Sequence, residues 1–133
     1  MKLVLANGVF ELCHWGHRQH LKAARKMGDL LYVSITDDAH VNKGEGRPVF
    51  NQFQRAEMIR DLEYVHGVMI VESALQALQA FRPDIFVKGK EYKGKISQED
   101  EEYCKEHGIE IAFTDEPVYS STQLLRFYES GRS

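Results

Sequence analysis

The sequence has no apolar run long enough to cross a membrane, and it has few cysteines and prolines: two and three in 133 residues. A helical membrane span needs about 20 consecutive apolar residues, so no such span is expected. Basic residues are not in excess either, since 17 lysines and arginines are set against 20 aspartates and glutamates. The net charge of −3 and the pI near 6.1 give no basic footprint of the kind that nucleic-acid binding requires.

The two cysteines also exclude a disulfide framework and a cysteine-based metal site. Cys13 and Cys104 lie far apart and have no metal-type spacing. We expect two reduced thiols and a cytoplasmic location, because the N-terminus enters an apolar strand directly and shows no signal-peptide pattern. The length and a hydrophobic content of 43% fit one domain, residues 1–133, with no repeats or low-complexity tracts.

Apolar runs rich in β-forming residues alternate with helical patterns along the chain. The predicted strands are residues 3–6, 30–35, 68–71, 85–87 and 109–113. The first predicted helix begins near residue 17. Four further helices are predicted at residues 52–62, 74–81, 98–107 and 122–128. This alternation predicts an α/β fold, a Rossmann-like, doubly wound, five-stranded parallel sheet with helices on both faces.

Ligands of such sheets bind at the carboxyl ends of the strands, where the strand order reverses. The loops after the first, second, fourth and fifth predicted strands are therefore expected to carry the chemistry. These loops contain the segments 7–17, 43–48, 88–92 and 120–122, which hold most of the glycines, histidines, lysines and hydroxyls of interest.

The first of these loops, residues 7–17, reads NGVFELCHWGH. Gly8 is expected to allow a tight turn, and Gly16 to allow another group to approach the backbone closely. A helix that begins near His17 presents free backbone N–H groups and its positive dipole end, which attract phosphate. His14 and His17 can donate hydrogen bonds to phosphate oxygens and stabilise charge that develops there.

A metal site is an alternative for the histidines of this segment. His14, His17 and His20 are spaced in threes, as ligands on one helical face would be. Gly16 and the turn argue against one face carrying all three, and no carboxylate follows in zinc-enzyme spacing. We therefore expect phosphate binding by His14 and His17, and a surface position for His20.

The motif His14-Trp15-Gly16-His17, after the turn Gly8-Val9-Phe10, resembles the HxGH signature of the nucleotidyltransferase superfamily often called the cytidylyltransferase family. Its members join a nucleoside triphosphate to a phosphorylated partner and release pyrophosphate. Glu11 stands where the family usually has an aspartate. The resemblance spans nearly the whole chain.

Two further segments resemble one branch of this family, the heptose-1-phosphate adenylyltransferase domains. Residues 43–48 read KGEGRP, and residues 83–92 read PDIFVKGKEY, with Glu91 where the branch has an aspartate. The chain lacks the R-T-x-G segment of glycerol-3-phosphate cytidylyltransferases, and it has Glu63 where those enzymes tend to have an arginine. These features favour ATP over CTP.

The resemblance also implies roles for individual residues. The implied catalytic residues are His14, His17 and Lys43. The implied nucleotide-binding residues are Gly8, Val9, Phe10, Gly16, Lys88, Gly89, Glu91, Ser120, Ser121 and Thr122. The implied substrate contacts are Glu11, Arg47 and Arg55, with a helix-surface position as the alternative for Arg55. Mg²⁺ is expected to bind through the phosphates rather than through protein side chains, and a homodimer is expected.

Two alternatives remain open at this point. One is a CTP-dependent cytidylyltransferase of the glycerol-phosphate type. The other is a nucleotide-binding sensor without turnover, because Glu11 and Glu91 depart from the family pattern. The sequence does not name the phosphorylated acceptor.

Overall fold

The computed structural model describes residues 1–11, 15–42, 44, 46 and 48–115. The strands are β1 (Leu3–Gly8), β2 (Leu30–Thr36), β3 (Gly67–Val71), β4 (Ile85–Gly89) and β5 (Glu110–Thr114). The helices are α1 (Trp15–Arg25), α2 (Gln52–Arg60), α3 (Ala74–Phe81) and α4 (Gln98–His107), with short 3-10 turns at Asp38–His40 and Lys90–Tyr92. The helix predicted at 122–128 lies outside the described residues.

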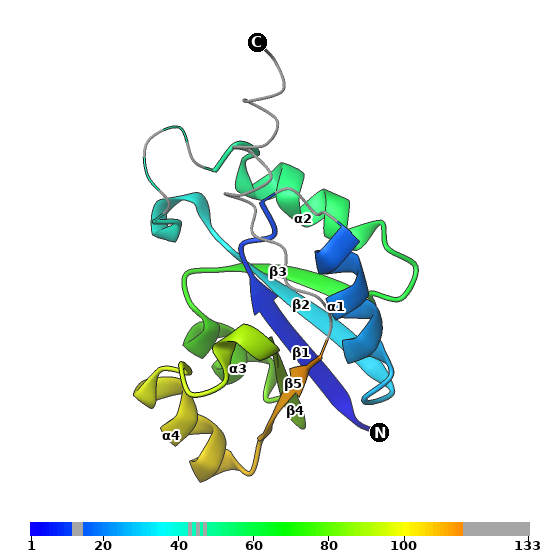
Figure 1. Ribbon diagram of the computed structural model, residues 1–133, viewed down its shortest axis with the longest axis vertical. Coiled ribbons are helices and arrows are strands. Elements are labelled where there is room, and N and C mark those ends of the chain that lie inside the picture. Colours follow the sequence, from blue (N-terminus) through cyan, green and yellow to red (C-terminus); the bar gives the residue numbers. More distant parts are fainter. Residues whose placement is uncertain (12–14, 43, 45, 47, 116–133) are drawn as a thin grey trace.

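The five strands form one parallel sheet in the order β3-β2-β1-β4-β5, which confirms the predicted α/β fold. Figure 1 shows β1 and β2 crossing the centre of the molecule, with α1 and α2 on one side and α3 and α4 on the other. The chain moves outward from β1 to β3, then returns to the far side of β1 for β4. The strand order therefore reverses between β1 and β4.

Two apolar cores lie on the two faces of the sheet. Alternate side chains of β1 point to opposite faces, so Val4 packs toward α1 and α2 while Leu5 packs toward α3 and α4. Val4, Leu5 and Ala6 are fully buried. A strand that is buried on both faces needs a continuous apolar run, which explains why residues 3–6 were recognisable in the sequence.

The helix ends follow local capping rules. The side chains of Ser73 and Ser97 accept hydrogen bonds from the backbone N–H groups of Gln76 and Asp100, as N-caps do. Gly108 closes α4 with a left-handed backbone, at φ 67°.

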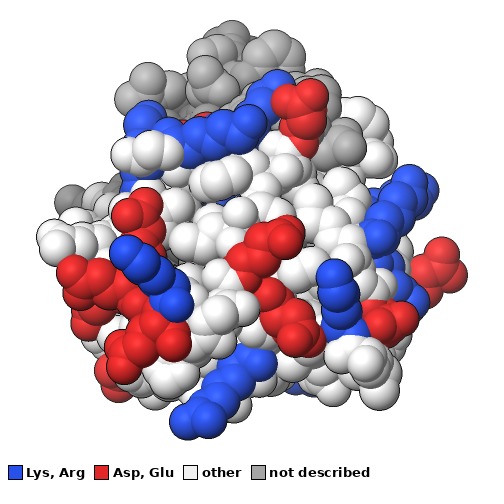
Figure 2. All heavy atoms as spheres, turned by 90° about the horizontal axis from the view of Figure 1, so that it is seen from below, with Lys and Arg blue, Asp and Glu red and all other residues white. Residues whose placement is uncertain are grey.

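Charged side chains are spread over the face seen from below in Figure 1. Figure 2 shows lysines and arginines interspersed with aspartates and glutamates on this face. No large patch of one sign is visible there. Among the described residues, no helix has the length and apolar character that crossing a membrane requires.

Candidate functional site

The loop that follows β1 is shaped by an unusual backbone conformation at Phe10. Phe10 has a left-handed backbone, at φ 51°, yet its side chain is only 4% exposed. A Cβ atom on Gly8 would lie 2.9 Å from Cε2 of the Phe10 ring, so this packing requires glycine. Gly8 therefore allows the Phe10 ring to pack closely against the backbone, whereas the turn conformation that was expected at Gly8 is adopted by Phe10.

Phe10 in turn contacts His17, on the first turn of α1. The two rings meet edge to face, with centroids 5.1 Å apart and an interplanar angle of 70°. Gly16 is buried and Trp15 is 56% exposed, so Trp15 is not part of the core. This packing fixes the His17 ring beside the loop and near the start of α1.

Arg55 holds this loop to its surroundings from inside the protein. Its guanidinium donates hydrogen bonds to the backbone oxygens of Val9 at 2.9 Å, Thr36 at 2.7 Å and Phe50 at 3.0 Å. It also donates to a carboxylate oxygen of Asp38 at 2.7 Å. Arg55 is fully buried, so the helix-surface alternative is wrong. Its contacts in the chain are structural, because they join the ends of β1 and β2 to the start of α2.

Glu11 is also fully buried, and its carboxylate accepts a hydrogen bond from the Val49 N–H at 3.2 Å. The loop after β1 is thereby attached to the segment that leads into α2. The proposed substrate contacts of Glu11 and Arg55 stay predictions. In the described part of the chain, both residues stabilise the loop after β1 through hydrogen bonds inside the protein.

Lys88 lies at the carboxyl end of β4 among aromatic rings. Its Nζ atom is 4.5 Å from the centre of the Tyr92 ring and 5.7 Å from that of Phe86. Burial lowers the pKa of the Lys88 ammonium, while Asp100 and Glu91 oppose this shift. Burial, together with Glu91, raises the pKa of Tyr92. A partly desolvated ammonium attracts an anion more strongly than a solvated one.

Gly89 allows Glu91 to fold back over this strand end. A Cβ atom on Gly89 would collide with the Glu91 carboxylate, so a larger residue would displace that side chain. Glu91, an implied nucleotide-binding residue, therefore lies directly beside the end of β4.

His20 is the residue that sequence reasoning placed wrongly. It was expected on the helix surface, but its Nδ1 atom lies 2.7 Å from Oγ1 of Thr114, in a part-buried contact. Burial, and then the charge of Lys88, lower the pKa of His20 to about 4. The ring is therefore neutral at pH 7. The sequence did contain a signal for this placement, because His20 follows His17 by about one helical turn and so lies on the same helix face. In the sequence analysis, that spacing was considered only as a sign of a metal site.

These side chains lie close to the point between β1 and β4 where the strand order reverses. β1 and β4 are neighbours in the sheet, so the loop after β1 and the end of β4 lie next to each other at its carboxyl edge. The structure thus brings together the predicted residues Gly8, Val9, Phe10, His17, Lys88 and Gly89. The predicted residues His14, Lys43, Arg47, Ser120, Ser121 and Thr122 lie outside the described residues.

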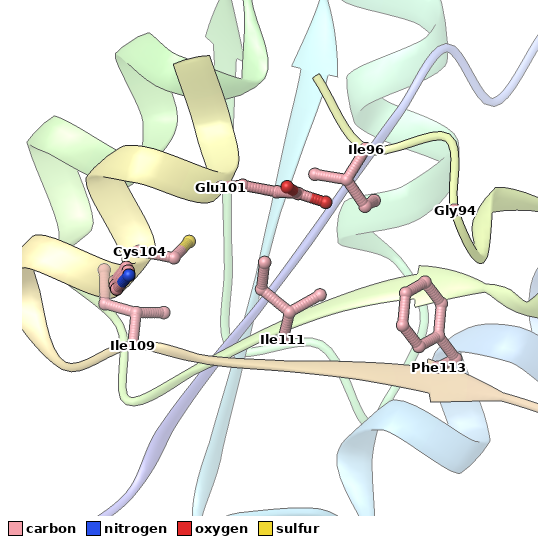
Figure 3. A pocket seen from close by; sticks show the side chains of 8 residues that line it. Gly94, Ile96, Glu101, Cys104, Ile109, Ile111 and Phe113 are labelled. Carbon is pink, nitrogen blue, oxygen red and sulfur yellow. The ribbon is translucent and has the colours of Figure 1, made fainter. Parts of the chain in front are cut away.

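A separate hollow of about 440 Å³ lies between α4 and β5. Ile96, Ile111 and Phe113 point into it, with Glu101 reaching over it from α4 (Figure 3). None of the predicted site residues lines this hollow. Within the described chain, no group of three histidine, cysteine, aspartate or glutamate side chains could hold a metal ion. The metal alternative that includes His14 is not tested, because His14 lies outside that part.

The fold and the site define a class of protein. A parallel α/β sheet with a glycine-dependent loop, a helix start and a cation at the strand-order reversal has the organisation of a nucleotide-binding domain. Residues 5–127 match the model of the cytidylyltransferase-like family, and the chain belongs to that family. It is a nucleotidyltransferase by family.

Similar proteins point in the same direction. The bifunctional protein HldE of Campylobacter jejuni subsp. doylei is 42% identical over 99 residues, which cover 71% of this chain and 22% of that protein. HldE of Nitratiruptor sp. is 41% identical over 98 residues, covering 71% of this chain and 21% of that protein. The chain thus spans about a fifth of the length of these relatives.

Solved structures show the same fold. A lipopolysaccharide core biosynthesis protein from Thermoplasma volcanium superposes with a TM-score of 0.75 at 25% identity, covering 89% of this chain and 99% of that one. Pantoate-beta-alanine ligase from Francisella tularensis superposes with a TM-score of 0.62 at 17% identity, covering 99% of this chain and 72% of that one. At that identity the second likeness concerns the fold alone.

Proposed function

We propose that this chain transfers a nucleoside monophosphate, with ATP as the favoured donor, to a sugar phosphate or polyol phosphate and releases pyrophosphate. One observation carries the proposal: His17 and Lys88 come from different elements and flank the reversal of strand order. This is the place where a parallel sheet binds its ligand.

In this reaction, an oxygen of the acceptor phosphate attacks the α-phosphorus of the triphosphate in line. The bond from the α-phosphorus to the oxygen that bridges to the β-phosphate breaks, and pyrophosphate leaves with that oxygen. Such a transfer needs little covalent chemistry from the protein, so positioning and charge stabilisation carry the rate.

We assign each residue a role in this reaction according to its position in the fold. His17, with His14, stabilises the charge that develops on the α-phosphate. Lys88, partly desolvated at the end of β4, attracts the negative charge of the bound nucleotide. The sequence-based roles remain part of the proposal for Lys43, which adds positive charge, and for residues 120–122, which bind the phosphate tail.

Mg²⁺ fits this proposal only as an ion carried by the phosphates. We propose that the protein holds the ion indirectly, through the triphosphate. When bound, Mg²⁺ neutralises charge on the β- and γ-phosphates.

The proposed acceptor is a sugar 1-phosphate of the heptose type, and the proposed site of action is the cytoplasm. Support comes from the resemblance of residues 83–92 to heptose-phosphate adenylyltransferase domains and from the HldE relatives. The structural likeness to a lipopolysaccharide core biosynthesis protein agrees with a role in surface polysaccharide synthesis. We also propose that the chain acts as a homodimer, as the family commonly does.

The test measures pyrophosphate release with a panel of triphosphates crossed with sugar 1-phosphates and glycerol 3-phosphate. His17→Ala and His14→Ala should each lower turnover by about 10²–10³-fold, because each removes a donor to developing charge. His107→Ala, at the end of α4, is the matched control. Tight triphosphate binding without pyrophosphate release would favour the sensor, and a clear preference for CTP would refute the branch assignment.

A further inference from the structure

The contact between His20 and Thr114 joins two segments that are 94 residues apart in the sequence. The two side-chain atoms are 2.7 Å apart, and Thr114 is only 4% exposed. A hydrogen bond that is shielded from water in this way is stronger than a surface bond, and it is costly to break on one side. Neither residue belongs to the HxGH motif or to the implied site residues.

The position of His20 on α1 connects this bond to the proposed site. His20 follows His17 by three residues, and side chains three apart lie on neighbouring parts of one helix face. A bond that fixes His20 therefore also fixes the rotation of α1 about its own axis. The direction in which His17 points depends on that rotation.

The other end of the bond is anchored in the sheet. Thr114 is the last residue of β5, and it pairs in register with Gly89 at the end of β4. Lys88 directly precedes Gly89, and its charge is close enough to lower the pKa of His20. The bond thus runs from the helix that carries His17 to the strand pair that carries Lys88.

We propose that His20 is a positioning residue for nucleotidyl transfer, which fixes His17 relative to the ends of β4 and β5 through its bond to Thr114. Because the ring is neutral at pH 7, it acts by geometry and not as a charged ligand of phosphate. The kinetic part of this proposal rests on the proposed function. The geometric part does not.

Four variants and one control separate geometry from general stability. His20→Leu and Thr114→Val remove the bond with little change in volume, and the double variant removes both partners. His20→Asn restores a polar atom at the place of Nδ1, because the Asn amide branches from the same carbon position. Lys22→Asn, at an exposed position of α1, controls for the lower helix propensity of asparagine.

We measure kcat and KM for the triphosphate, together with the ring NMR signals of His17. His20→Leu and Thr114→Val should each lower kcat about tenfold or more, with KM changed by less than about twofold, since a misplaced group affects the transition state most. The double variant should resemble the single variants, because both remove one shared bond. His20→Asn should recover most of the rate, and Lys22→Asn should behave as the unaltered protein.

Unchanged kcat and unchanged His17 signals in folded His20→Leu would overturn the proposal, and so would additive losses in the double variant. If the unaltered protein releases no pyrophosphate with any acceptor, the proposed function fails by itself. The His17 signals then decide the geometric part: equal displacement in His20→Leu and Thr114→Val supports it, and no displacement refutes it.

Discussion

Replacing Arg55 by alanine should destabilise this protein far more than a surface arginine would. The guanidinium is fully buried and donates four hydrogen bonds, to three backbone oxygens and to Asp38. Alanine leaves all four acceptors without their donor. Each buried acceptor that loses its partner costs about 1–3 kcal/mol, although water that enters the vacated space recovers part of this.

The expected total is about 3–5 kcal/mol, mostly from the three part-buried backbone acceptors, because the Asp38 side chain is 41% exposed and water can replace its lost donor. Per-residue unfolding entropies imply about 3–4 °C for each kcal/mol in a chain of this length, so the melting temperature should fall by about 10–20 °C. Thermal and urea unfolding, followed by circular dichroism, measure this change. Arg60→Ala, on the exposed side of α2, is the matched control and should stay within about 0.5 kcal/mol of the unaltered chain.

Arg55→Lys refines the test. Lysine keeps the positive charge but lacks the planar guanidinium that reaches several acceptors at once. The stability of Arg55→Lys should therefore lie between that of Arg55→Ala and that of the unaltered protein. A melting temperature of Arg55→Ala within a few degrees of the unaltered protein would refute the reasoning, because the three part-buried backbone acceptors could not then depend on this side chain.

Three further predictions concern the packing at Gly8, the pKa of His20 and the thiol of Cys104. Gly8→Ala should cost about 1–3 kcal/mol of stability and lower turnover, because its methyl group would displace the Phe10 ring from His17; unchanged turnover and stability would contradict the packing argument. His20 should lower the free energy of unfolding by about 2 kcal/mol between pH 7 and pH 5. The pKa of His20 is about 4 in the folded chain and near its usual 6.5 when unfolded, so protons favour the unfolded state in this window. His20→Asn should remove this contribution, and an identical pH dependence of stability in both proteins would contradict the prediction. Cys104 is buried and its pKa is raised to about 11, chiefly by that burial, so it should resist iodoacetamide at pH 8 in the folded protein and react after unfolding, as peptide mass mapping would show.

Much of the fold could be predicted because its signals are local. The strand that became β1 is an apolar run buried on both faces, and the caps Ser73, Ser97 and Gly108 act within one turn of their own helices. The predicted strands match the structure within about two residues at their ends. Alternation of strands and helices was sufficient to predict the parallel sheet.

The parts that were missed depend on partners distant in the sequence. The sequence indicates that Arg55 is charged, and charged residues are usually exposed. Its burial became visible only once the ends of β1 and β2 were placed around it. His20 was missed for the same reason, since its partner Thr114 comes 94 residues later. The left-handed backbone of Phe10 is equally hidden, because only the packing of its ring against His17 explains it.

The separation of the two cores also divides the tasks of the molecule. The buried supports of the proposed site, Arg55 and the helix that carries His17, belong to the layer of α1 and α2. The layer of α3 and α4 packs on the opposite face, around side chains such as Leu78 and Phe86. Substitutions within that second layer can therefore raise or lower resistance to heat while the loop after β1 keeps its shape. For protein engineering, the surroundings of Leu78, away from Lys88 and its neighbours Phe86 and Asp100, are the place to add stability, and the α1–α2 layer is the place to alter chemistry.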